Sequence, residues 1–370
     1  MAGTAALAAS LLAITQTAFA QTAPVPPLTG AEIFRAACAS CHGPDGRGAP
    51  PEAVAFANAL PDFTDCEFAP REPDATWIAI IHGGGPARAF NQIMPAFGDA
   101  LTLEQIKAAL GHVRTLCTDP AWPRGDLNFP KALVTEKAFP EDEMLFTTTA
   151  ALEGPGAVST RVVYERRFGA RTQMEFGVPM RFEARPADEG SASHWVRGLG
   201  DAAVAVKRVL VHSLPRGQIL SATAEVVVPT GRESVGLGGG LGAVEPFLTY
   251  GQMLPVGWFV QAQSGIGIPL KSGAPKDAQW RAVFGRSFWP QRFGRMWSPM
   301  IEVLGGRELV RGERAFWDVV PEMQVTVSTR QHIRANVGVR VPVNNAATRS
   351  TQFMAYLLWD WYDGAFFVGW

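Results

Sequence analysis

The sequence predicts a multidomain fold, in which a small all-α domain precedes an antiparallel transmembrane β-barrel of about 12 strands. Only 18% of the 370 residues are charged, whereas about 25% is usual for soluble domains. The hydrophobic pattern is helical up to residue 118 and alternates strictly after residue 143. Every Trp except Trp77 and Trp122 lies beyond residue 190. The apolar and aromatic excess therefore belongs to the second part of the chain.

The N-terminus indicates export. Residues 2–20 form a short apolar stretch that ends in an A-x-A-like cleavage site before Gln21, which predicts a signal peptide over 1–20. A short membrane anchor is the competing interpretation, and the polar residues 15–17 disfavour it because they interrupt the apolar core. The Pro-rich residues 21–28 are expected to form a linker.

Cys38, Cys41 and His42 form a C-x-x-C-H motif, which is the attachment motif of c-type haem. The two thiols lie on one helical turn and add to the haem vinyl groups, and the His becomes the proximal ligand of the iron. A thioredoxin-like motif would follow a strand, whereas residues 30–37 have a helical pattern. A zinc site would need a second pair of ligands at short spacing, which is missing.

The surroundings of this motif resemble a class I, monohaem cytochrome c over residues 28–118, and we place the domain at 29–118. A helix over 30–40 and the Gly-rich loop 43–48 carry the resemblance. It implies one covalent haem c and a distal Met ligand on a loop before the last helix. Met94, followed by Pro95, fits that position, so His42 and Met94 are the expected iron ligands.

Two histidines compete with Met94 as the distal ligand. His82 precedes three Gly residues and lies at the start of a loop. His112 lies on the closing helix, where packing against the first helix is the favoured interpretation. That helix begins with a capping box at 102–105.

The other two cysteines, Cys66 and Cys117, are expected to form a structural disulfide, because the compartment is oxidising. The bond would tie the loop after the haem motif to the end of the closing helix.

Residues 119–142, with four Pro residues, are expected to form a linker. Beyond it, residues 173–182, 319–327 and 333–343 alternate between apolar and mostly polar positions, as expected for strands with two different faces. A soluble sandwich buries the apolar face, whereas an outer-membrane barrel exposes it to lipid. Long strands, connections of alternating length and Trp residues near strand ends favour a barrel over 143–370.

The strand count is ambiguous by one. Thirteen candidate segments begin near residues 143, 159, 171, 201, 217, 243, 257, 278, 295, 314, 332, 350 and 364. Bacterial barrels contain an even number of strands, so 12 is favoured. The chain ends in the aromatic segment 366–370, which resembles the assembly signal of outer-membrane proteins.

Several charged residues are expected to face the lumen. They are Glu165, Arg167, Glu175, Arg181, Glu225, Glu322, Arg334 and Arg340. One interpretation is that they pair across a narrow lumen, because a charge that faces lipid is costly. The other is that they line a polar permeation path.

The second part also resembles the outer-membrane, transporter-like barrels of the phenol-degradation MetA type. The alternation of strands and turns over most of 143–370, including the Gly- and Pro-containing segments 177–179, 267–269 and 338–342, carries this resemblance, which includes no catalytic motif.

The leading hypothesis is an outer-membrane-anchored c-type cytochrome that carries electrons and is not itself an enzyme. Its haem domain would face the periplasm of a Gram-negative bacterium and exchange electrons with periplasmic redox proteins. The alternative is an outer-membrane channel for a small solute, with the haem domain as plug, sensor or redox coupler. A haem enzyme is least supported, because His/Met ligation leaves no open position on the iron. Nucleic acid is not an expected partner, because 33 Lys+Arg against 34 Asp+Glu give no basic surface.

Overall fold

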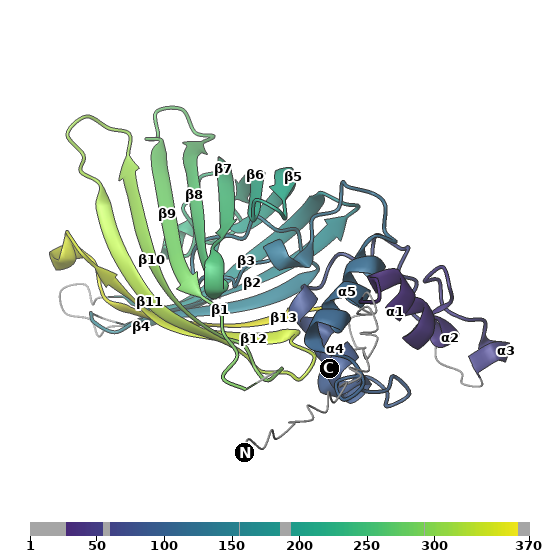
Figure 1. Ribbon diagram of the computed structural model, residues 1–370. Coiled ribbons are helices and arrows are strands. Elements are labelled where there is room, and N and C mark those ends of the chain that lie inside the picture. Colours follow the sequence, from purple (N-terminus) through teal and green to yellow (C-terminus); the bar gives the residue numbers. More distant parts are fainter. Residues whose placement is uncertain (1–26, 55–59, 155, 186–193, 292, 362–370) are drawn as a thin grey trace, which may run out of the picture.

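The computed structural model describes residues 27–54, 60–154, 156–185, 194–291 and 293–361. The expected signal peptide, most of the linker 21–28 and the aromatic tail 366–370 lie outside these residues. A small helical domain is joined to one end of a large β-barrel (Figure 1). In the described parts of the chain, no helix has both the length and the hydrophobicity of a membrane span.

The helical domain is built on two capped helices that cross closely. Its elements are α1 (Gly30–Ala37), α2 (Ala39–His42), α3 (Pro51–Val54), α4 (Asp74–Gly83), η1 (Gly85–Arg88) and α5 (Leu103–Arg114). Capping boxes begin α1 and α5, where they satisfy backbone N–H groups that lack helical partners. A Cβ on Gly30 would lie 2.0 Å from the carbonyl oxygen of Ala108, so the crossing of the two helices requires glycine.

The barrel contains 13 described strand segments. They are β1 (Glu143–Ala151), β2 (Ala157–Phe168), β3 (Thr172–Arg185), β4 (His194–Leu199), β5 (Ala202–Ser213), β6 (Gln218–Val228), β7 (Ala243–Met253), β8 (Trp258–Pro269), β9 (Asp277–Arg286), β10 (Trp297–Glu308), β11 (Phe316–Thr326), β12 (Ile333–Pro342) and β13 (Gln352–Asp360). Each pairs antiparallel with its neighbours, and the pairing of β1 with β13 closes the sheet.

These segments occupy 12 positions around the barrel. Strand β3 pairs with β5 over 172–177 and with the short β4 over 180–185. Segments β4 and β5 therefore share one position in the sheet, interrupted at Gly200 and Asp201. The prediction of a 12-strand barrel is confirmed, and 12 of the 13 predicted starts coincide with its strands to within a few residues. The thirteenth, at 364, lies outside the described residues.

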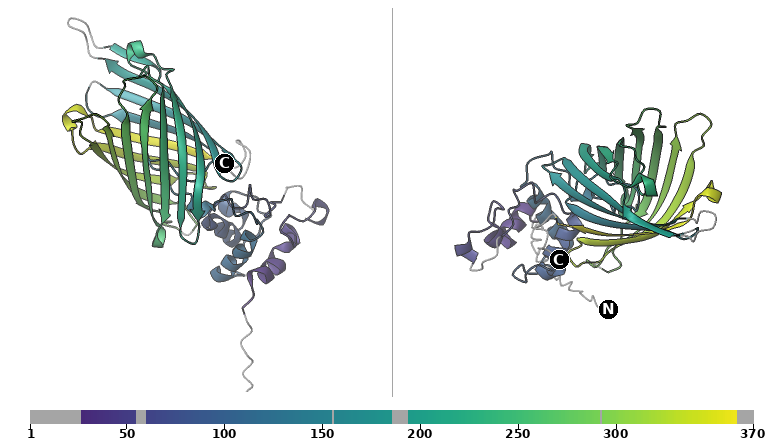
Figure 2. Two further views of the ribbon diagram at one scale, coloured as in Figure 1. Left: turned by 90° about the horizontal axis from the view of Figure 1, so that it is seen from above. Right: turned by 180° about the vertical axis from the view of Figure 1, so that it is seen from behind.

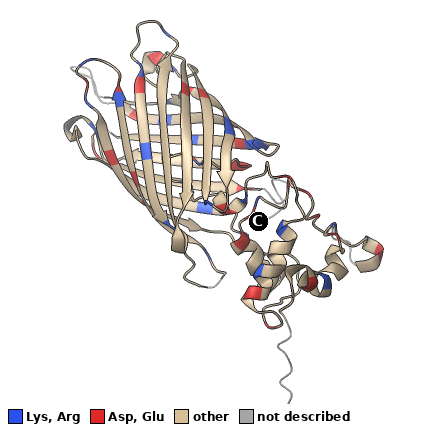
Figure 3. Cartoon of the chain, turned by 45° about the horizontal axis from the view of Figure 1, so that its top comes forward, with Lys and Arg blue, Asp and Glu red and all other residues tan. Residues whose placement is uncertain are grey.

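The barrel has an apolar outer wall and a polar interior. On β3, Phe176 and Val178 are 44% and 38% exposed, whereas Gln173 and Glu175 are 0% and 7% exposed. On β11, Glu322 and Gln324 are likewise buried in the lumen. A soluble sandwich would bury the apolar face. The observed orientation is that of a transmembrane barrel, in which the surrounding lipid covers the apolar face. Charged residues of both signs are scattered along the strands without a large patch of one sign (Figure 3).

The two ends of the barrel differ. The end next to the helical domain has the connections 169–171, 214–217, 254–257, 287–296 and 327–332. The opposite end has the longer connections 229–242 and 343–351, and the shorter 152–156, 186–193, 270–276 and 309–315. Two short 3-10 helices, η3 (Glu233–Val235) and η5 (Ala346–Thr348), lie in the longer ones. Figure 2 shows the helical domain against one end of the barrel in both views.

We expect Val178→Arg to lower the free energy of unfolding of the barrel by about 2–4 kcal/mol, because it puts a charge on the middle of the lipid-facing wall. Urea unfolding in lipid vesicles measures the effect. Ser272→Arg, which adds the same charge to an exposed loop, is the control and should cost far less. Equal unfolding free energies for the two variants would contradict a lipid-facing position of Val178.

Candidate functional site

The C-x-x-C-H motif lies at a tight helical junction. Cys38 ends α1, and its N–H donates to the carbonyl oxygen of Phe34 at 2.9 Å. Cys41 and His42 lie in α2, and the N–H of His42 donates to the oxygen of Cys38 at 2.9 Å. Both cysteines are free and half-buried. The local helix thus places two thiols and an imidazole on one short segment, as the motif predicted.

The surroundings of His42 fit a haem ligand. Its Nδ1 atom is buried and has no hydrogen-bond partner within the described residues. Burial lowers the pKa of His42, which favours the neutral imidazole that metals require. The ring centroid lies 4.8 Å from that of Phe63, a neighbour that no motif in the sequence indicated. An unpartnered buried nitrogen beside two free thiols fits a covalently attached haem.

An apolar cluster surrounds this segment. Its buried members are Phe34, Phe63, Trp77, Leu110 and Val113, with Cys38 and Ala39 packed against them. The guanidinium of Arg114 lies 4.3 Å from the centre of the Trp77 ring. Residues from α1, α4 and α5 therefore meet next to the motif, and they provide the dry environment in which a haem binds.

Met94 lies on the loop between η1 and α5 and is half-buried. The N–H of Gly85 donates to the carbonyl oxygen of Met94 at 3.0 Å, so the loop folds back onto η1. His82 has a different environment: its ring lies 5.0 Å from that of Phe293, which belongs to the barrel. The ring of His112 lies 5.3 Å from that of Phe34, which is the helix-packing role expected for it.

The remaining cysteines, Cys66 and Cys117, form a disulfide with a Cα–Cα distance of 5.1 Å. It closes a loop across a sequence separation of 51 residues. The bond connects the segment that precedes α4 to the chain just after α5, where the domain leads into the barrel. It thus fixes both sides of the apolar cluster.

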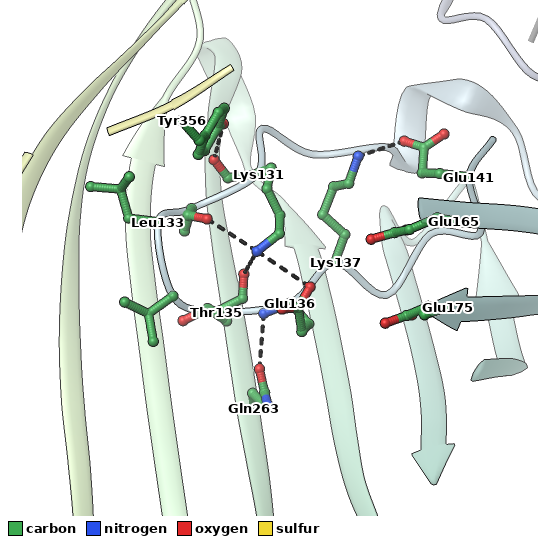
Figure 4. A network of polar contacts seen from close by, with 12 residues as sticks. Lys131, Leu133, Thr135, Glu136, Lys137, Glu141, Glu165, Glu175, Gln263 and Tyr356 are labelled. Carbon is green, nitrogen blue, oxygen red and sulfur yellow. Dashed lines mark hydrogen bonds and ion pairs between the residues drawn. The ribbon is translucent and has the colours of Figure 1, made fainter. Parts of the chain in front are cut away.

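The segment 119–142, expected to be a linker, has a further role. From residue 129 onward nearly every residue is buried. Phe129 and Phe139 pack against apolar side chains of β5, β6, β8, β9 and β10 inside the barrel. We call residues 129–142 the lumen segment. It crosses the barrel interior before the chain enters β1 (Figure 4).

Two carboxylates hold the backbone of the lumen segment. Glu302 of β10 accepts the N–H groups of Val134 and Thr135, each at 2.9 Å, and the hydroxyl of Thr135 at 2.7 Å. Glu322 of β11 accepts the N–H of Leu133 at 2.9 Å. Because a buried donor without a partner costs about 1–3 kcal/mol, these carboxylates stabilise the segment in the lumen.

The carbonyl oxygens of the segment are satisfied from other sides of the barrel. The oxygen of Lys131 accepts from the hydroxyl of Tyr356 at 2.5 Å, and that of Pro130 accepts from Gln261 at 2.8 Å. Further donors to the segment are Ser221 of β6 and Arg281 of β9. Gln263 accepts the N–H of Glu136 at 2.9 Å. The contacts therefore reach around the lumen, and Figure 4 shows Gln263 and Tyr356 pointing toward the segment.

The buried lysines of this region are all paired. Lys137 lies 2.6 Å from Glu141 and 2.8 Å from Glu143. Lys131 forms an ion pair with Glu136 at 3.3 Å, and Lys207 of β5 forms one with Glu175 at 3.0 Å. Buried charges are tolerated when partners compensate their desolvation. The lumen segment thus supplies part of the charge that balances the polar wall.

Most of the charged residues predicted to face the lumen also have partners there. Their ion pairs include Arg161 with Glu225 at 3.3 Å, Arg334 with Asp360 at 3.0 Å, Arg340 with Asp318 at 2.5 Å, Arg181 with Glu183 at 3.9 Å, and Lys207 with Glu165 at 4.0 Å. Arg167 donates to the oxygen of Ala170 at 2.6 Å. The structural interpretation of these residues is therefore favoured over a permeation path. The pattern did not indicate Lys207, which is followed by Arg208, or Glu302, which is an isolated charge in the apolar middle of β10.

Ion pairs also join the helical domain to the barrel. Arg71, which lies before α4, forms a 2.5 Å ion pair with Asp142 at the end of the lumen segment. Glu72 lies 3.5 Å from His332 on the turn between β11 and β12. Asp142 also accepts the N–H of Arg167 on β2 at 3.0 Å. The domain is therefore docked directly on the barrel end where the lumen segment enters.

Fold and site together define a haem-binding helical domain joined to a membrane-type barrel. The family described as cytochrome c oxidase, cbb3-type, subunit III matches residues 26–113. The chloroplastic cytochrome c6 of Chlamydomonas reinhardtii is 31% identical over 117 residues, which are 32% of this chain and 71% of that protein. Through its N-terminal domain, the chain belongs to the cytochrome c family. Membership in this family indicates haem c and electron transfer.

The barrel is similar in fold to outer-membrane channels. An outer membrane channel from Pseudomonas putida F1 is 11% identical to this chain, with a TM-score of 0.42. The match covers 63% of this chain and 99% of the channel. The KdgM porin is 8% identical, with a TM-score of 0.39, and the match covers 59% of this chain and 99% of the porin.

We expect the double variant Glu302→Ala/Glu322→Ala to loosen the lumen segment, because three backbone N–H groups lose their acceptors at about 1–3 kcal/mol each. Ion conductance in planar lipid bilayers should rise above that of the unmodified protein. Glu245→Ala removes a carboxylate from β7 at the other half of the lumen and should leave conductance unchanged. Equal conductance in the unmodified protein and the double variant would contradict the sealing role of the segment.

Proposed function

We propose that this protein is an electron carrier of the periplasm, anchored in the outer membrane by its barrel. The observation that carries this proposal is the fit of the C-x-x-C-H segment to haem, in a cytochrome c domain docked on a transmembrane barrel. Cys38 and Cys41 would hold one haem c through thioethers, and His42 and Met94 would be its axial ligands. When bound, the haem supplies an iron that accepts and releases one electron.

The protein residues of this site determine how the carrier works. The cluster around Phe63 and Trp77 excludes water, and the neutral imidazole of His42 provides a nitrogen ligand. A thioether ligand from Met94 favours reduced iron and raises the potential. If His42 and Met94 both ligate the iron, no coordination position would be left for a substrate. The site therefore supports electron transfer over catalysis.

The orientation of the domain follows from the barrel ends. Bacterial barrels have short turns on the periplasmic side and longer loops outside. The helical domain lies at the end with the mostly short turns, next to the turns after β9 and β11. This arrangement supports a haem domain that faces the periplasm, where soluble redox proteins would meet it.

The lumen segment bears on the alternative function as a channel. Residues 129–142 fill the part of the lumen near the helical domain and bond to strands around the barrel. A solute would have to displace this segment, and the helices of the haem domain do not themselves enter the lumen. We therefore favour the anchor role, with solute passage as the second candidate.

We expect Met94→Ala to abolish the absorption band near the red edge of the visible spectrum that reports iron–sulfur ligation in the oxidised protein. The haem should stay covalently attached, because Cys38 and Cys41 are unchanged, and its potential should fall. Visible spectroscopy and a redox titration measure both effects. His82→Ala is the matched control and should keep the band. Survival of the band in Met94→Ala would reject Met94 as the ligand.

We expect the haem-stained protein to fractionate with the outer membrane and to migrate differently in gels before and after heating, as folded barrels do.

In intact cells, a membrane-impermeant thiol label should not reach a cysteine placed at Glu52 on α3, and this cysteine should react after the outer membrane is permeabilised. A cysteine at Ser272, on the opposite end of the barrel, should react in intact cells. The reverse pattern would contradict the periplasmic orientation.

A further inference from the structure

The turns of the barrel contact the segment that leads to Met94. Arg88 ends η1 and is 2% exposed. Its Nη1 atom donates to the carbonyl oxygen of Phe293 at 2.7 Å, on the turn between β9 and β10, and to that of Ala87 at 2.9 Å. The Phe293 ring packs beside His82 on α4. One barrel turn therefore holds both the end of α4 and the end of η1.

A second barrel turn holds the next two residues of this segment. Arg330, between β11 and β12, donates from Nη2 to the carbonyl oxygen of Ala89 at 3.3 Å. Its guanidinium lies 4.1 Å from the centre of the Phe90 ring, within the range of a cation–π interaction. The segment 88–90 is thus contacted from two turns that are 37 residues apart in sequence, as the positions of Phe293 and Arg330 show.

The backbone is strained at these same contacts. Ala89, Phe293 and Gln331 have φ values of 54°, 60° and 71°, in the left-handed region that non-glycine residues seldom adopt. Such residues are unfavourable and persist only when the surrounding structure determines their conformation. Strain on both sides of one interface indicates that the docked geometry is imposed by the contacts between the domain and the barrel.

Gly84 and Gly85, just before the segment 88–90, pack directly against the backbone of the Met94 loop. A Cβ on Gly84 would lie 2.9 Å from the carbonyl oxygen of Met94. A Cβ on Gly85 would lie 2.0 Å from the oxygen of Asn91. Gly85 also donates its N–H to the oxygen of Met94, and Phe90 donates its own to the oxygen of Gly85. Contacts therefore continue from the barrel turns through 85–90 to the residue expected to bind iron.

We propose that Arg330 and Phe293 of the barrel are positioning residues for the distal haem ligand. They hold residues 88–90 and the end of α4, against which the Met94 loop folds, and so would strengthen the bond between iron and the Met94 sulfur. This inference rests on the proposed His42/Met94 ligation. Ligands held by a supporting shell of contacts bind metal more firmly than ligands on a free loop. The barrel would then set a property of the haem, in addition to its location.

The test uses the full-length protein loaded with haem. Oxidised protein is titrated with imidazole, which competes with Met94 for iron, and loss of the red-edge absorption band is followed. The variant Arg330→Gln/Phe293→Ala removes both side-chain contacts. Arg216→Gln, on an exposed position of another turn at the same end, is the matched control. Heat-modifiable migration in gels checks that each barrel is folded.

We expect the double variant to lose half of the band at a roughly tenfold lower imidazole concentration, a typical size for coupling between two sites. The control should match the unmodified protein. Equal midpoints in all three proteins would overturn the inference and leave the ligation intact. Absence of the band from the unmodified protein would overturn the ligation itself. If the double variant does not fold, Phe90→Leu removes the ring beneath Arg330 from the haem-domain side and should shift the midpoint in the same direction.

Discussion

The need to satisfy polar groups in a lumen enclosed by lipid is the constraint on which the rest of this structure depends. The apolar wall faces outward, so Glu302, Glu322 and Lys207 must find partners inside the barrel. The lumen segment provides backbone N–H groups for the two glutamates, and Glu175 and Glu165 of neighbouring strands pair with Lys207. Removing the segment would leave buried charges with fewer partners, which costs several kcal/mol for each ion. The barrel and the segment therefore stabilise each other.

Docking of the haem domain follows from the path of this segment. The chain leaves α5, passes Cys117 and enters the lumen at residue 129, and residues 121–128 of this connection are themselves buried or half-buried. Arg71 and Asp142 close the connection from the other side. The helical domain is consequently held at one end of the barrel by its covalent connection and by side-chain contacts. A tether of the kind expected from the sequence would have allowed it to move freely.

Local patterns predicted the features that depend on local chemistry. The alternation at 173–182 and 333–343 indicated the strands and their faces, because each face meets a different solvent. The C-x-x-C-H motif likewise placed Cys38 and His42 on one helical turn, because its residues are close together in sequence. The lumen segment was not predictable in this way: its partners lie on strands up to about 225 residues away, as for Lys131 and Tyr356, and its Pro residues are typical of a linker. The role of Arg330 was hidden likewise, because its acceptor is a backbone carbonyl 241 residues earlier.

A single haem-attachment motif, in a domain at one end of the barrel, limits what the protein can do alone. The sequence contains a single C-x-x-C-H motif, in the domain outside the barrel, and the lumen segment consists of ordinary side chains. A barrel of this height, with strands of about ten residues, spans the membrane, which is too far for one cofactor at its end to connect the two sides. The contacts of Arg71, Phe293 and Arg330 fix the orientation of the helical domain relative to the barrel. If the domain transfers electrons as proposed, its partners would approach from the side of α1 and α3, since the opposite side is covered by the turns that carry Phe293 and Arg330.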